Sequence, residues 1–367
     1  MWFDVDKAGL AALLEARGKS FAVFELVQNA WDADPNEVSI ELKPILSEPY
    51  ALLTVADDSP EGWADLSHAF TLFSRSRRAD EPAKRGRFSL GEKLVLSLCR
   101  NAKIVTITVS VIFNDTGRHR RSECRSRGTL FECQIRMTRD ELAEVEQSIT
   151  QLIPPVPTIF NGQPLNRPVP LKTFTAKLPT MIADDDGNLR PSVRQASVEV
   201  YGGEAGGILE LGIPICDADW PWRLNVLQKV PLGMDRASVT DAFRRSLQVA
   251  AMNAMADTLN GEQAVTSWAS EAMGDSRILP DALKHIVTQR FGERAVVAVP
   301  GDPVANATAE ANGSPVIHGG ALSAGAWANI RKHRLIPSTS QAFPTPAPSA
   351  AAEAPTICPL CKQARRA

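Results

Sequence analysis

The chain has 367 residues and a formal net charge of -2, and 44% of its residues are hydrophobic. This length predicts two domains with a smaller appendage, and the charge argues against wrapping of nucleic acid over the whole surface, although a local basic patch is compatible with it. The six scattered cysteines predict no disulfide framework, and no run of about 18 apolar residues predicts a membrane span. We therefore expect a cytoplasmic protein without membrane contact.

The first part of the chain has the pattern of an α+β domain. Periodicity predicts helices over residues 5–17, 20–33, 90–100 and 138–153, and strands over residues 37–44, 50–58, 102–113 and 128–137. The arginine-rich segment 117–128 is interpreted as a hairpin tip, where a solvated turn is favoured over a polyanion contact. The proline cluster at 154–157 predicts that this domain covers residues 1–155.

The rest of the chain divides into three further parts. Residues 156–260 combine strands with a long helix, and the strands are expected at 158–165, 171–182, 194–203 and 207–215, with the helix at 238–259. Residues 261–337 alternate short helices and strands, which predicts a small α/β module. Residues 338–367 form a disordered tail rich in proline, alanine and serine. The tail ends in Cys358 and Cys361, a pair without a second pair, so an exposed thiol pair is favoured over a metal site shared with His333 or another chain.

Three polar residues interrupt the apolar run of the second predicted helix. At 100° per residue, Glu25, Asn29 and Asp32 share one narrow sector, and Val27 and Trp31 lie opposite. A solvated surface is the common reason for such a face. A binding pocket is the alternative, and the following motifs favour it.

Further motifs follow this helix in a fixed order. Asp57 ends a predicted strand and leads a turn that contains Gly62. Gly86 and Gly91 frame a loop that opens onto a helix, and Thr129 begins a later strand. Each of these features alone is a common turn signal, whereas their order along the chain is specific.

Residues 15 to 137 resemble the GHKL superfamily of ATPases, which includes gyrase, the heat-shock chaperone ATPases, histidine kinases and MutL. The resemblance implies a Bergerat-type α/β sandwich that binds ATP. It implies a general base at Glu25, a Mg²⁺ ligand at Asn29, an adenine-binding aspartate at Asp57, and Thr129 as the residue supporting that aspartate. The other implied nucleotide-binding residues are Asp32, Ala33, Gly62, Gly86, Arg87, Phe88, Ser89, Leu90, Gly91 and Lys93.

The chemistry of these residue types agrees with the implied roles. A carboxylate reads an exocyclic amine by accepting its hydrogen bond, and a threonine hydroxyl can support that carboxylate. A glycine loop at a helix N-terminus presents N–H groups to phosphates, and Lys93 can add a cation. An amide oxygen suits Mg²⁺, and Glu25 can take a proton from water. Ser59 and Ser89 stand where relatives often have glycine.

The second domain resembles the transducer domain that follows the ATPase domain in several relatives. Its segment 226–239 is similar to the loop that places a cation at the γ-phosphate, which implies a catalytic role for Arg236 or, in the gyrase-like alternative, Lys229. A plain surface cation is the alternative for each residue. Gln228 is a further candidate.

The predicted function is Mg²⁺-dependent ATP binding and hydrolysis by an ATP-gated clamp, either chaperone-like or involved in DNA transactions. The expected ligands are ATP, ADP and Mg²⁺, and the expected partner is a second copy bound in the presence of nucleotide. The sequence does not distinguish a client protein from DNA. The alternative is an interaction module that binds nucleotide without hydrolysing it, but such a module has no need of a base at Glu25.

Overall fold

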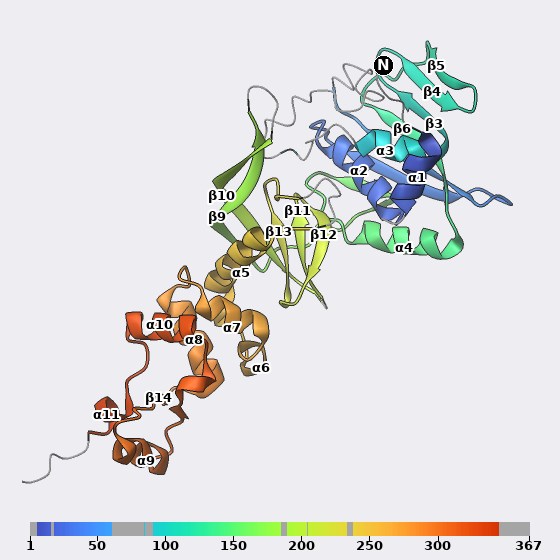
Figure 1. Cartoon of the computed structure of the whole chain (residues 1–367). Coiled ribbons are helices and arrows are strands. Elements are labelled where there is room, and N and C mark those ends of the chain that lie inside the picture. Colours follow the sequence, from blue (N-terminus) through green and yellow to red (C-terminus); the bar gives the residue numbers. More distant parts are fainter. Residues whose placement is uncertain are drawn as a thin grey trace, which may run out of the picture. The chain divides into compact units, whose positions relative to one another are not determined.

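The computed structural model describes residues 6–15, 18–60, 84, 91–184, 189–203, 205–232 and 238–344. The chain forms two compact units, Met1–Leu247 and Gln248–Ala367, which divide within helix α5 (Asp241–Met255; Figure 1). Among the described residues, no helix is both long enough and apolar enough to cross a lipid bilayer.

The first unit contains an eight-stranded sheet in the order β5-β4-β3-β6-β2-β1-β7-β8. Its strands are β1 (Val38–Pro44), β2 (Tyr50–Asp57), β3 (Cys99–Val105), β4 (Ser110–Asn114), β5 (Gly117–Arg121), β6 (Leu130–Arg136), β7 (Thr158–Phe160) and β8 (Gln163–Pro164). Its helices are α1 (Lys7–Glu15), α2 (Ser20–Trp31), α3 (Gly91–Leu98) and α4 (Arg139–Thr150).

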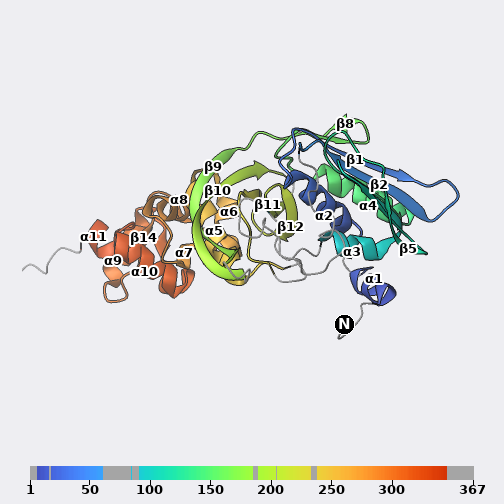
Figure 2. The same cartoon turned by 90° about the horizontal axis from the view of Figure 1, so that it is seen from above.

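One face of this sheet is buried under helices. Along β2, buried and half-buried residues alternate, so Leu53 and Val55 lie on the covered face. The core joins them to Val27 of α2, Val95 of α3 and other residues of β1, β3, β6 and α4. Figure 2 shows the helices along one side of the strands. These two layers form the α/β sandwich that the sequence predicts.

The same unit contains a second, five-stranded sheet in the order β12-β11-β13-β10-β9. Its strands are β9 (Lys172–Ala183), β10 (Leu189–Gly202), β11 (Gly206–Glu210), β12 (Ile213–Ala218) and β13 (Trp222–Val226). Helix α5 follows it, as the transducer-like prediction requires.

The second unit is mostly helical. Its helices are η3 (Ala256–Thr258), α6 (Gly261–Ala264), α7 (Ser267–Gly274), α8 (Pro280–Phe291), α9 (Pro303–Ala311), η4 (Gly319–Ala321), α10 (Ala324–His333) and α11 (Thr339–Ala342). The parallel strands β14 (Val296–Val297) and β15 (Val316–Ile317) flank α9 and make the small α/β module.

The α+β class is confirmed, but several local expectations are wrong. Segment 102–113 is not one strand, because a turn at Thr106 separates β3 from β4. Segment 117–128 is not only a turn, because residues 117–121 form β5 at the sheet edge. Residues 338–344 are ordered, because Ser338 begins α11 with a capping box and Thr339 is buried. Strand β13 was not anticipated.

The proline cluster at 154–157 does not end the first sheet. Strand β7 pairs in parallel with β1, and the indole Nε1 of Trp31 donates to Thr158 Oγ1 at 3.1 Å. The sheet therefore continues to Pro164, while the division into four segments proposed from sequence stays a prediction.

A buried polar chain fixes the second sheet to the segment after α4. Glu199 Oε2 accepts from the Tyr201 hydroxyl and from Asn225 Nδ2, both at 2.8 Å. Burial, together with the hydrogen bond to Glu199, raises the pKa of Tyr201 to about 12. Asn225 Oδ1 accepts from Gly212 N, and Gly212 O accepts from Ile153 N at 2.8 Å. This series of hydrogen bonds therefore ends at the backbone contact between Gly212 and Ile153.

Two hairpins of the first unit have the same two-residue turn in different surroundings. Asn161-Gly162 joins β7 to β8 and Leu211-Gly212 joins β11 to β12, with positive φ at all four residues. A Cβ on residue 162 would meet open space, whereas one on residue 212 would overlap the carbonyl oxygen of Ile153. Gly212 is therefore required for close approach as well as for its φ.

We expect Gly162→Ala to lower the free energy of unfolding by about 1 kcal/mol, the cost of a positive φ. Gly212→Ala should cost about 1–3 kcal/mol more, because the new Cβ forces the backbone apart. Urea denaturation of both variants measures the difference. Equal losses would show that the contact between Gly212 and Ile153 does not constrain the fold.

Candidate nucleotide site

The polar face of α2 is not a solvated surface. Glu25 is 7% exposed and Asp32 is 8% exposed, while Asn29 is half-buried. Val23, Val27 and Trp31 are buried elsewhere around the same helix. This burial contradicts the solvated-surface interpretation and is compatible with the pocket interpretation.

The Glu25 carboxylate lies against the start of α3. Gly91 is the first residue of that helix, and a Cβ there would overlap Glu25 Oε2. The absence of a side chain at position 91 is therefore what allows the carboxylate to lie at this helix N-terminus. The structure thus brings together Glu25 and Gly91, which are 66 positions apart in the sequence.

Asp57 lies on the helix-covered face of the sheet. The alternation along β2 places it on the same side as Leu53 and Val55, and it is 6% exposed. Ser59 donates to Asp57 Oδ1 from its N–H at 2.9 Å and from its hydroxyl at 2.5 Å. Both bonds between this side chain and described residues end on Oδ1, so Oδ2 is the oxygen available to a ligand. The serine that replaces a family glycine therefore orients the aspartate.

Thr129 contacts Asp57 through the backbone, and the hydroxyl that donates to the Asp57 carboxylate is that of Ser59. Asp57 N donates to Thr129 O at 2.9 Å, which extends the pairing of β2 with β6. Gly128 has φ +69, and a Cβ there would overlap the carbonyl oxygen of Asp57. Gly128 is thus the residue that lets the start of β6 approach the aspartate.

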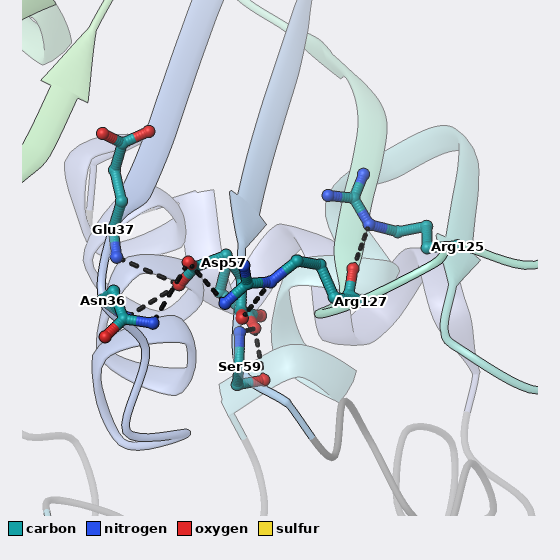
Figure 3. Close-up of polar contacts among 7 residues, drawn as sticks. Asn36, Glu37, Asp57, Ser59, Arg125 and Arg127 are labelled. Carbon is teal, nitrogen blue, oxygen red and sulfur yellow. Dashed lines mark hydrogen bonds and ion pairs between the residues drawn. The ribbon is translucent and has the colours of Figure 1, made fainter.

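Asp58 is a structural residue that the sequence analysis did not identify. Its carboxylate accepts from the backbone N–H groups of Asn36 and Glu37 at 2.7 and 3.0 Å (Figure 3). Arg127 pairs with Asp58 Oδ2 at 3.0 Å and also donates to its backbone oxygen at 3.0 Å. These bonds hold the loop after α2 and the segment before β6 against the end of β2.

Of the other residues predicted for the nucleotide site, some lie among the described residues and some do not. Lys93 is buried on α3, two residues after Gly91, and Ala33 follows the end of α2 half-buried. Lys84 pairs with Asp34 in the loop after α2 at 2.7 Å. Seven predicted residues lie outside the described residues: Gly62, Gly86, Arg87, Phe88, Ser89, Leu90 and Arg236.

The two candidate cations of the second domain, Lys229 and Arg236, both lie in the segment between β13 and α5. Lys229 is fully buried, its carbonyl accepts from the Thr180 hydroxyl at 2.8 Å, and the next residue, Val230, donates its N–H to Glu210. Leu232 and Val239 form an antiparallel bridge, and Arg236 lies between them in the sequence but outside the described residues. Lys229 lies inside the packed structure.

The comparisons with known proteins agree with the family resemblance. Residues 18–126 match the family described as "Histidine kinase-, DNA gyrase B-, and HSP90-like ATPase". This segment therefore belongs to the GHKL superfamily of ATPases. A search of curated protein sequences found no significant match.

Solved structures with similarity to the chain include two from topoisomerase II. The ATPase region of the Saccharomyces cerevisiae enzyme is 9% identical and has a TM-score of 0.38, and the match covers 61% of this chain and 78% of that chain. The ATPase and transducer domains of the Balamuthia mandrillaris enzyme are 10% identical with a TM-score of 0.39, and the match covers 62% and 81% of the two chains.

The Asp58 contacts predict a defined dependence of stability on pH. Burial tends to raise the pKa of this carboxyl, but the backbone N–H groups of Glu37 and Asn36 and the charge of Arg127 lower it overall. A lowered pKa in the folded state means that the contribution to stability is complete above the unfolded value of about 3.9. The contribution is lost as the pH falls through the folded value.

We therefore expect the stability difference between the wild type and Asp58→Asn to be constant near neutral pH and to shrink below about pH 4. Urea denaturation at a series of pH values measures it. Asp115→Asn, in the exposed β4–β5 turn, is the matched control. A difference that stays constant down to pH 3 would contradict the assignment of Asp58 as an ionised clamp.

Proposed function

We propose that this chain binds ATP together with Mg²⁺ and hydrolyses it, with Glu25 as the general base. The observation that carries the proposal is the position of Glu25, whose buried carboxylate lies against the first residue of α3. Helix N-termini favour phosphate groups, because their N–H groups are unpaired and the dipole is positive there. A phosphate at this helix would therefore lie beside the proposed base.

The adenine end of the proposed site is the end of β2. Asp57 Oδ2 would accept a hydrogen bond from the exocyclic amine, while Ser59 holds Oδ1. Thr129 accepts a backbone hydrogen bond from Asp57 and so adjoins this residue in the sheet. Asp32, the residue after α2, lies seven positions from Glu25, or about 10 Å along the helix axis. Adenine and the terminal phosphate would thus contact opposite ends of one helix face.

Asn29 fits the requirements of the proposed Mg²⁺ ligand. It lies one turn from Glu25 on the same face and is half-buried. Its amide oxygen is a hard donor, and Mg²⁺ commonly takes one or two protein oxygens with phosphates and waters. When bound, the ion would neutralise charge on the phosphates. Lys93, buried on α3, would add a second positive charge near them.

The proposed reaction is attack of water on the γ-phosphorus. Glu25 takes a proton from the water, the bond from the γ-phosphorus to the bridging oxygen breaks, and ADP leaves with that oxygen. A cation from the second domain, Arg236 or Lys229, is proposed to stabilise the charge that develops on the γ-phosphate. We further propose that ATP binding closes a homodimeric clamp, because the second domain would then contribute to a nucleotide site in the first.

Two substitutions separate the proposed roles. Glu25→Gln should leave ATP affinity nearly unchanged and lower kcat by roughly 10²–10⁴-fold, because only proton transfer is lost. Asp57→Asn should remove ATP binding itself, because the amide can present a donor to the adenine amine. Calorimetry with a non-hydrolysable ATP analogue and steady-state turnover measure these two effects.

Glu41→Gln is the matched control, because Glu41 is an exposed carboxylate of β1. It should change neither quantity. Unchanged turnover in Glu25→Gln would contradict the assignment of Glu25 as the general base, whereas ATP binding without turnover in the wild type would leave the non-hydrolysing nucleotide module as the better account. Unchanged affinity in Asp57→Asn would contradict the adenine assignment.

A further inference from the structure

The edge strand β5 carries a concentration of positive charge that the nucleotide site does not use. Residues 117–127 contain five arginines and one glutamate, although the whole chain has a net charge of -2. Arg118, Arg120 and Arg121 are exposed on β5, at the edge of the eight-stranded sheet (Figure 1). We define these three residues, with Arg125 and Arg127, as the arginine edge.

Carboxylates neutralise only part of this region. Glu123 pairs with Lys103 at 2.7 Å, and Arg127 pairs with Asp58. Arg120 and Arg121 form no ion pair with any described residue. They lie next to each other along the strand, so their side chains point to opposite faces of the ribbon. Both faces of the edge therefore carry an uncompensated guanidinium.

Protection against pairing with another sheet accounts for charge on an edge strand. It does not account for charge of a single sign, because a mixture of signs protects equally well and is usual on protein surfaces. Arginine also differs from a generic cation, since its planar fork matches the geometry of phosphate oxygens. The residue type and the sign together indicate an anionic partner that carries phosphates.

The shape of the edge distinguishes between phosphate-bearing partners. β4 and β5 form an antiparallel ribbon whose register ends at the pair Asn114 and Gly117, across a two-residue turn. A two-stranded ribbon fits the major groove of B-form DNA, whereas the major groove of A-form RNA is too deep and narrow for it. The positive charge and the shape of the ribbon thus favour B-form DNA over A-form RNA as the partner.

We propose that the arginine edge binds the phosphate backbone of double-stranded DNA without sequence preference. Arg120 and Arg121 contact phosphates, and the β4–β5 ribbon lies along the groove between them. This surface is made by β4, β5 and the segment up to Arg127, so binding does not require ATP. The proposal stands or falls separately from the proposed ATPase activity.

The test is fluorescence anisotropy of the full chain with a labelled DNA duplex, without nucleotide, over a series of salt concentrations. The wild type should bind more weakly as salt rises. Arg120→Ala with Arg121→Ala removes two phosphate contacts, so the slope of log affinity against log salt should fall by about 2. At 0.15 M salt this corresponds to about 30-fold weaker binding.

Two further variants separate charge from folding and from position. Arg120→Lys with Arg121→Lys retains the charge, so most of the salt slope should be retained. Lys177→Ala with Arg194→Ala removes two exposed cations of the five-stranded sheet and should bind as the wild type does. Thermal unfolding of each variant should be unchanged, because the four side chains are exposed.

Three results would overturn the proposal. The first is wild-type affinity in the double alanine variant. The second is equal affinity for an A-form RNA duplex, which would contradict the groove argument. The third is competition by poly-glutamate as effective as that by unlabelled DNA, which would make an acidic protein the better partner.

Discussion

Asp57 and Asp58 leave the end of β2 in opposite directions, because successive side chains of a strand point to opposite faces. Asp57 turns to the face covered by helices, where Ser59 holds one of its oxygens. Asp58 turns to the loop after α2 and to Arg127. A slip of one residue in the register of β2 would exchange the two carboxylates. The geometry of the candidate site therefore depends on the pairing of β2 with β1 and β6.

Close approach of backbone and side chains is the second constraint on the site. Gly128 allows the start of β6 to contact Asp57, and Gly91 leaves room for the Glu25 carboxylate at the start of α3. Two pairs of segments distant in sequence, β2 with β6 and α2 with α3, thus come into contact. A larger residue at either glycine would move a carboxylate and not merely loosen the packing.

The sequence predicted the ATPase fold well where strong local signals exist. The helix at 20–33, the strands at 37–44 and 50–58 and the order of the polar motifs were all readable from periodicity and turn residues. The split between β3 and β4 was not readable, because its turn contains no glycine or proline. Thr106 makes the turn instead, by donating to the carbonyl of Val109 and accepting from its N–H.

The parts of the site that sequence reasoning missed depend on tertiary contacts. In the sequence, Asp58 looks like any residue of an acidic turn. Its role depends on contacts with Asn36, Glu37 and Arg127, which form only in the folded structure. The ordered segment 338–344 was a different kind of error, because Ser338 and Gln341 have capping-box spacing, which the proline- and serine-rich composition obscured. The burial of Lys229 depends on β9 and β11 and has no signature in its local sequence.

The central claim is that the Asp57 carboxylate reads the base of a bound nucleotide. Adenine presents an amino donor where guanine presents a carbonyl acceptor, and a carboxylate facing an acceptor leaves two buried groups unpaired. Calorimetric titration of the chain with ATP and with GTP, each with Mg²⁺, therefore tests the claim most directly. The account predicts ATP binding about 5- to 150-fold tighter than GTP binding, the discrimination expected from a cost of about 1–3 kcal/mol. Equal affinities for the two nucleotides would contradict it.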